Sequence, residues 1–329
     1  MYVKRVIDPK IIYYFSWRAL LITTVLSTTV FFLYHFLQIR ALSIPFLPIA
    51  TVGTAVAFTI GFKNNSSYDR LWEARKIWGE LTNISRAITG YVLAAIRTDE
   101  GTAAAKSFVY RQIAYVNLLR AQLRCRNVWD DAHIYTKLAT AFFENKPFEQ
   151  EREEIFSTFC SNDEAESLRS HHNPAQGVLN LQMQALAQFK ERGWVDAYES
   201  SDLMRMCVDL YVQQGKAERI KSFPFPRQYA FFSEVFVFIF MGLLPFGLIG
   251  EFAKLSESHT WLTIPFSVLI SFVFYTMEKV GDTSENPFEG GLNDVPMTAI
   301  CRIIEIDLKQ MLNETEIPAP IEAIDYVLM

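Results

Sequence analysis

The stretch that decides the fold is PFLPIATVGTAVAFTIGF, residues 45–62, which contains no charged side chain. Lipid offers no partner for backbone N–H and C=O groups, so a run of about 17 to 25 mostly apolar residues crosses a bilayer as a helix. The stretch therefore predicts a membrane-spanning helix, and the chain is predicted to be an integral membrane protein.

Further apolar segments of the same kind lie on both sides of a polar middle region. They are Trp17–Leu37, Tyr229–Gly250 and Trp261–Met277. The alternative is that all these runs are core helices of a soluble protein, but Trp or Tyr near their ends fits the aromatic belts of membrane helices. The first run is too long for the apolar region of a signal peptide and is followed by no small-residue cleavage site, so we expect it to be retained. The prediction is an all-α fold with four transmembrane helices.

The positions of Lys and Arg predict the orientation of these helices. The basic residues next to the first two spans are Lys4, Arg5, Lys10, Arg18, Lys63, Arg70, Arg75 and Lys76. The linkers 38–44 and 251–260 carry only one Arg and one Lys. The positive-inside rule then places both termini and the middle region in the cytoplasm.

The middle region reads as helical and water-exposed, with apolar residues at helical spacing. Its expected helices, with one more in the tail, are 69–92, 108–128, 146–160, 174–191, 196–214 and 298–312. The predicted organisation is an N-terminal segment with two spans (1–62), a cytosolic helical region (63–228), two further spans (229–277) and a cytosolic C-terminal segment (278–329).

Composition and motifs exclude several classes of function. Half of the residues are hydrophobic and the net charge is -5, with no Lys/Arg run that would track nucleic-acid phosphates, so nucleic acid is not an expected partner. The four cysteines have no CxxC spacing. No phosphate-binding, dinucleotide, hydrolase or HExxH motif occurs. We expect no catalytic residue, no metal and no cofactor, hence a protein that is not an enzyme.

Within residues 45–62, Thr54, Phe58 and Phe62 recur every four residues and so form one stripe on a helix. The small residues between them would let neighbouring helices approach closely; these are Gly53, Ala55, Ala57 and Gly61. Around a symmetry axis the stripe would become apolar rings that narrow a path, a constriction that gates by dewetting. Periodicity alone leaves helix packing open as the alternative.

Three blocks in the same order resemble bacterial bestrophins. Residues 61–79, GFKNNSSYDRLWEARKIWG, resemble the family's G-F-[RK]-N-N-x-x-Y-x-R-x-x-E-A-R-K-x-W-G. Residues 217–226 resemble C-E-R-I-x-x-T-P-[IF]-P, with Ala217 for Cys and Phe223 for Thr. ENPF (285–288), NDVP (293–296) and IEIDL (304–308) resemble E-D-P-F, N-D-L-P and I-E-I-D-L.

The resemblance implies a homopentamer in a bacterial-type inner or plasma membrane, with one axial pore and mostly helical subunits. The family's membrane neck falls on Thr54, Phe58 and Phe62, which is the stripe already found. Bacterial members often carry an aliphatic residue where Thr54 stands, so one ring is expected to be wetter here.

The resemblance also implies a cytosolic aperture on the helix before the second block. Counting back from Ala217 places it at Glu199, give or take one residue, which includes Tyr198 and Ser200. Carboxylates around this exit would attract cations; the alternative is a solvated Glu199 outside the path. The calcium-binding acidic run of animal bestrophins is incomplete here, because residues 281–294 keep only Asp282, Glu285, Glu289 and Asp294.

The predicted function is a pentameric channel for monovalent ions, more specifically cations such as sodium. The net charge and the possible Glu199 ring favour cations, whereas animal members of the resembled family conduct chloride. An anion-selective channel is therefore one alternative. A membrane transporter, scaffold or enzyme that uses the cytosolic helices is another. The expected partners are further copies of the chain, the lipid bilayer and the permeating ions.

Overall fold

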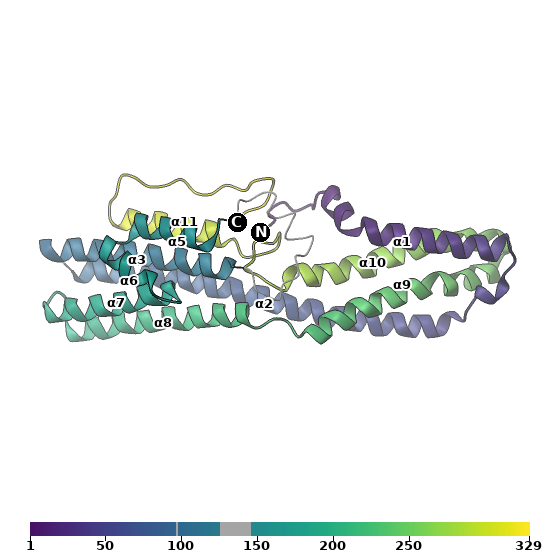
Figure 1. The fold of residues 1–329 in the computed structure, drawn as a ribbon, viewed down its shortest axis with the longest axis horizontal. Coiled ribbons are helices and arrows are strands. Elements are labelled where there is room, and N and C mark those ends of the chain that lie inside the picture. The colour runs from purple at the N-terminus through teal and green to yellow at the C-terminus, as the bar shows by residue number, and fades with distance from the viewer. Residues whose placement is uncertain (97, 126–145) are drawn as a thin grey trace. The chain divides into compact units, whose positions relative to one another are not determined.

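The computed structural model describes residues 1–96, 98–125 and 146–329 (Figure 1). The chain divides into two compact units. The membrane unit comprises residues 4–70 and 224–285, and the helical unit comprises residues 1–3, 71–223 and 286–329. Both are built from helices, and the described residues contain no strand beyond two isolated bridges.

The membrane unit contains the apolar helices. They are α1 (Pro9–His35), the first part of α2 (Phe46–Ala95), α9 (Arg227–Leu255) and α10 (Thr263–Ser284), with the 3-10 turns η1 (Arg40–Leu42) and η2 (Glu257–Leu262). Four helical segments here are long and apolar enough to cross a membrane, which confirms the predicted number of spans. The core of this unit gathers side chains such as Ile49, Ile60, Val237 and Leu244.

The contact between α1 and α10 depends on small side chains. The buried positions of α1 include Ser16, Thr23 and Ser27, and those of α10 include Ser267 and Ser271. The α1 hydroxyls donate to carbonyls of their own helix, for example Thr23 to Ala19 O at 2.9 Å. Such residues allow close helix packing where lipid gives no hydrophobic drive between helices.

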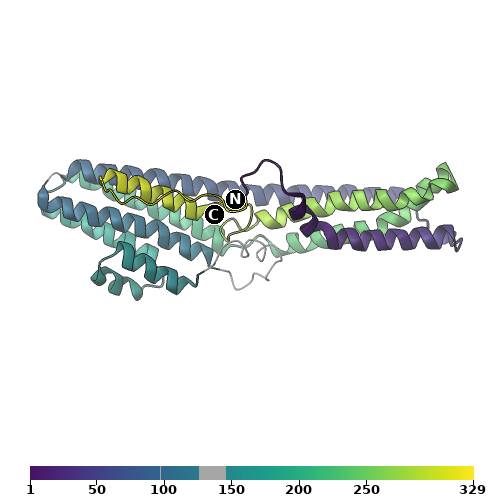
Figure 2. The same ribbon diagram turned by 90° about the horizontal axis from the view of Figure 1, so that it is seen from above.

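The helical unit is a bundle around α3. Its helices are the remainder of α2, α3 (Asp99–Arg124), α5 (Phe148–Phe159), α6 (Asn162–Arg169), α7 (Pro174–Glu191), α8 (Ala197–Ser222) and α11 (Met297–Met311). Trp78, Tyr115 and Phe156 are among its largest fully buried side chains. The two ends of the chain lie close together in this unit (Figures 1 and 2), where Val3 N donates to Tyr326 O at 2.9 Å.

The structure corrects some helix limits expected from the sequence. The span 45–62 and the helix 69–92 are one continuous helix, α2, because residues 63–68 contain no helix-breaking Gly or Pro. The expected helix 108–128 begins earlier, at Asp99, and its last residues, 126–128, lie outside the described residues. The short helix α6 was not expected, although Ser161 and Glu164 form a capping box at its start.

Candidate functional site

Thr54, Phe58 and Phe62 lie together on one exposed face of α2 in the membrane unit, as the spacing predicted. Phe58 is 66% exposed and Phe62 is 64% exposed. Their rings meet edge to face with centroids 5.0 Å apart. An edge-to-face pair holds both rings along the helix axis, so the two aromatic groups form one continuous apolar surface.

Thr54 is the polar residue of this surface, and its hydroxyl hydrogen is used within the helix. The hydroxyl donates to Ala50 O at 3.0 Å, one turn earlier on the same helix. A hydroxyl hydrogen used in this way is not available to water. The ring expected to be wetter is therefore less polar than the residue name suggests.

The opposite face of α2 packs inside the unit. Val56 and Ile60 are buried, and a Cβ built on Gly53 would lie 2.7 Å from the Phe240 ring of α9. Gly53 thus permits the close approach expected of it. A Cβ on Gly61, by contrast, meets no described atom within 4 Å, and Ala55 and Ala57 are exposed, so these residues do not serve packing within the chain.

Lys63, the residue after Phe62, is the buried centre of a group of charges that joins α2, α9 and α10. We call it the ion cluster, and it consists of Lys63, Ser233, Glu234, Glu278, Lys279 and Asp282. Lys63 Nζ pairs with Glu278 and with Asp282, and the other Glu278 oxygen accepts from Ser233 Oγ at 2.7 Å. Lys279 Nζ lies 2.9 Å from Asp282 and 2.9 Å from Glu234. Every charge in the cluster therefore has a partner of opposite sign.

The sequence carried a signal for the ion cluster that periodicity did not reveal. Lys63 ends the second apolar run, Glu234 lies inside the third, and Glu278 with Lys279 follows the fourth. Ionisable residues at the ends of or inside membrane segments usually pair with one another. The sequence could not say which of them pair, because the partners lie more than 200 residues apart along the chain, as with Lys63 and Glu278.

The residues predicted for the cytosolic aperture lie at the start of α8, in the helical unit. Glu199 closes a capping box with Asp196: its carboxylate accepts from Asp196 N at 2.8 Å, and Glu199 N donates to Asp196 Oδ1 at 2.7 Å. Tyr198 is 85% exposed, whereas Ser200 is buried. Of the three residues, Tyr198 is the one whose side chain extends fully into solvent.

Three of the four acidic residues kept from the calcium-binding region, Asp282, Glu289 and Asp294, have hydrogen-bond partners within the chain. Asp282 belongs to the ion cluster, and Glu289 pairs with Lys221 at 2.6 Å. Asp294 accepts from Gly290 N and Gly291 N at 2.8 Å each, and burial nevertheless raises the pKa of its carboxyl group. Within the described residues no group of three or more His, Cys, Asp or Glu could hold a metal ion.

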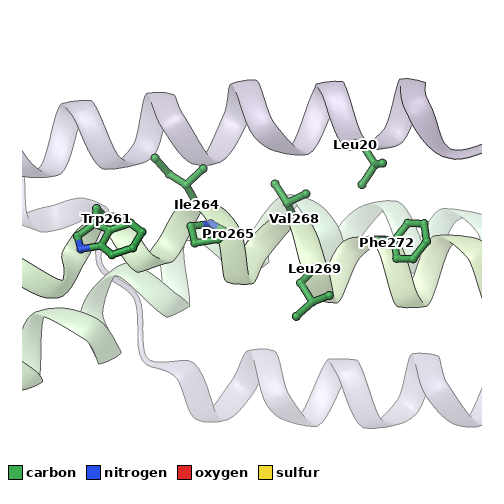
Figure 3. Close-up of a pocket in the computed structure, with 7 residues that line it drawn as sticks. All are labelled: Leu20, Trp261, Ile264, Pro265, Val268, Leu269 and Phe272. Atoms are coloured by element: carbon green, nitrogen blue, oxygen red, sulfur yellow. The ribbon is translucent and has the colours of Figure 1, made fainter. Parts of the chain in front are cut away.

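The cysteines and an open apolar hollow of the membrane unit do not resemble a reaction centre. Burial raises the pKa of the Cys160, Cys207 and Cys301 thiols to about 12, so they are not nucleophilic thiolates at neutral pH. The hollow has a volume of about 700 Å³ and an apolar lining along α1, η2 and α10 (Figure 3). Its lining residues are Leu20, Trp261, Ile264, Pro265, Val268, Leu269 and Phe272.

Four apolar helices, a second helical unit and an exposed aromatic stripe define a multi-pass α-helical membrane protein. The sequence profile of the family described as "Bacterial/Fungal Bestrophin protein" matches residues 5–310. The chain belongs to this family, which confirms the resemblance seen in the three sequence blocks.

Relatives and solved structures agree with this assignment. The voltage-dependent anion channel-forming protein YneE of Escherichia coli strain K12 is 28% identical over 302 residues, which cover 92% of this chain and 88% of that protein. The voltage-dependent anion channel-forming protein RSc3414 of Ralstonia nicotianae is 30% identical over 281 residues, covering 85% and 82%. The crystal structure of a bacterial Bestrophin homolog from Klebsiella pneumoniae superposes with a TM-score of 0.76 at 22% identity, covering 90% of this chain and 98% of that one, and supports the fold.

Proposed function

We propose that this chain is the subunit of a homopentameric ion channel whose membrane neck is formed by Thr54, Phe58 and Phe62. One observation carries the proposal: two large aromatic side chains on a membrane helix are about two thirds exposed while the opposite face of the helix is buried. An exposed apolar surface on a membrane helix meets lipid, a further subunit or a path. The names of the curated relatives, which call them channel-forming, support the choice of a path.

A neck of this composition acts on ions by hydration. None of its three side chains carries a charge, so an ion passing it gains no electrostatic compensation for lost water. A narrow ring of phenyl groups opposes wetting, and small changes in its width then alter conduction strongly. Fixed charges beyond the neck decide which sign of ion arrives.

We propose cations, such as sodium, as the conducted ions. Asp69 is exposed on α2 and lies seven residues after Phe62, which places both on the same face of the helix. A ring of Asp69 carboxylates below the neck would raise the local concentration of cations. Glu199, tied into its capping box, supplies a further carboxylate if α8 lines the exit.

Anion conduction is the second candidate, and a specific finding favours it. The relatives from Escherichia coli and Ralstonia nicotianae are named anion channel-forming proteins. Arg75 and Lys76 are also exposed, and they would attract anions if they faced the same path.

The proposed location is an inner or plasma membrane with both termini in the cytoplasm. The basic residues at the start of α1 and after the neck favour this orientation. The helical unit would then lie in the cytoplasm.

The test is a reconstitution of the purified chain in planar bilayers under asymmetric sodium chloride. A reversal potential that follows the sodium gradient supports cation conduction, and one that follows chloride supports the anion candidate. Absence of current under every condition, together with the mass of a monomer in solution, would overturn the channel and favour a transporter or scaffold. A mass of about five chains supports the symmetric pore.

A further inference from the structure

The ion cluster lies directly behind the proposed neck. Phe62 is 64% exposed and Lys63 is 3% exposed, although the two residues are neighbours on α2. Successive residues of an α-helix point about 100° apart, so the direction of Lys63 fixes the direction of Phe62. Whatever holds the Lys63 side chain therefore also sets the direction in which the Phe62 ring leaves the helix.

Lys63 forms ion pairs with two carboxylates of α10. Its Nζ pairs with Glu278, whose side chain is 1% exposed, and with Asp282, whose side chain is 16% exposed. Ser233 of α9 fixes the second Glu278 oxygen, and Lys279 fixes the second Asp282 oxygen. A rotation of α2 would pull one ammonium group away from two carboxylates that each have a second partner on α9 or α10.

The backbone of α10 closes the same contact. A Cβ built on Gly281 would lie 2.4 Å from Asn64 Oδ1 and 3.4 Å from Lys63 Cγ. Asn64 Nδ2 also donates to Met277 O at 3.0 Å. Two consecutive α2 residues are therefore fastened to one turn of α10, directly after the last residue of the stripe.

Holding two helices together with buried charges costs the desolvation free energy of those charges. Well-packed apolar residues of similar size often stabilise as much or more, so net stability alone does not account for a buried ion network. Ionisable groups within membrane helices are rare and mark functional positions. Here the register that the cluster defines is that of the stripe.

We propose that Lys63 is a positioning residue for the neck: its pairs with Glu278 and Asp282 fix the rotation of α2 and thereby the width of the Phe58 and Phe62 rings. The inference deepens the proposed function and rests on it. The charge on Lys63 does not meet the ion, because its side chain is buried among α2, α9 and α10.

The test compares three variants by the current per channel and by the rate of thiol modification at position 58. Lys63→Met removes the charge and keeps the length, and Lys63→Arg restores the charge. Lys221→Met is the matched control, because it breaks a lysine pair with Glu289 that is largely shielded from solvent but lies in the helical unit. The first readout is the current per channel in planar bilayers.

The second readout does not depend on conduction. Phe58→Cys is placed in a background in which the exposed Cys125 is changed to Ser, and its rate of reaction with a charged thiol reagent is measured. The remaining thiols have raised pKa values and react slowly. A rotation of α2 changes the accessibility of position 58 to the reagent, and hence the reaction rate.

Lys63→Met is expected to change both the current and the reaction rate by about twofold or more, with Lys63→Arg and Lys221→Met staying within that limit. Any other pattern contradicts the inference: an unchanged Lys63→Met, an arginine that does not restore, a control that shifts equally, or only one readout that moves. If Lys63→Met gives no monodisperse protein, Glu278→Gln takes its place, since glutamine still accepts from Ser233 and removes only the charge. If the unmodified protein passes no current, the proposed function fails, and the reaction rates alone decide the positioning role.

Discussion

Removal of the Phe62 ring separates the contribution of the stripe to conduction from its contribution to stability. Full burial makes Phe→Ala cost about 3–5 kcal/mol, and Phe62 is about one third buried, so Phe62→Ala should cost about 1 kcal/mol. Loss of the edge-to-face pair with Phe58 adds about 0.5–1.5 kcal/mol. The variant should therefore fold and assemble.

Its conduction should change far more than its stability. The ring that we propose narrows the path is replaced by a methyl group, and a wider apolar neck wets more easily, so the current per channel should rise by about threefold or more. Phe156→Ala is the control, because that ring is 1% exposed in the helical unit and its loss should cost about 3–5 kcal/mol without widening the neck.

The assay is single-channel recording in planar bilayers together with thermal unfolding in detergent. A Phe62→Ala channel with unchanged conductance would place the stripe away from the axis and leave helix packing as its role. A variant that loses stability as severely as Phe156→Ala would show instead that the ring is buried in the assembly.

Three further predictions concern other parts of the chain. Gly281→Ala should destabilise the membrane unit by about 1–3 kcal/mol because its Cβ would overlap the Asn64 oxygen. Gly215→Ala has no described atom within 4 Å of a built Cβ, so this control should stabilise the protein by about 0.5–1 kcal/mol. Equal melting temperatures of the two variants would contradict this reasoning. Glu199→Gln should preserve the α8 cap and weaken cation preference, seen as a shift in reversal potential, and an unaltered preference would remove Glu199 from the ion path. Burial raises the pKa of Asp294, so its contribution to stability is present at low pH and is lost as the pH rises through the folded-state value. The free energy of unfolding of Asp294→Asn should therefore exceed that of the unmodified chain near neutral pH, and the difference should shrink toward about pH 4. A difference that stays constant across that range would refute the reasoning.

The sequence predicted most of the fold because membrane helices obey a simple rule. Backbone groups in lipid must be satisfied locally, so runs such as 45–62 and 229–250 can only be helices. Helix α7 was expected at 174–191 and spans Pro174–Glu191. Asn and Pro at its start and a regular apolar period define its limits. The predicted break in the helix between residues 62 and 69 was wrong. Polar residues such as Lys63 and Ser67 are typical of a loop in sequence, but here they are buried in α2.

The candidate site divides in the same way. The sequence by itself determined that Thr54, Phe58 and Phe62 share one face, because a spacing of four residues follows from helix geometry alone. Tertiary structure decided that this face is the exposed one, that the Thr54 hydroxyl is used by Ala50, and that Lys63 finds its carboxylates on α10. Those facts depend on which helices pack against α2, and contacts between segments far apart in the chain are set by the packing of the whole unit rather than by any local pattern.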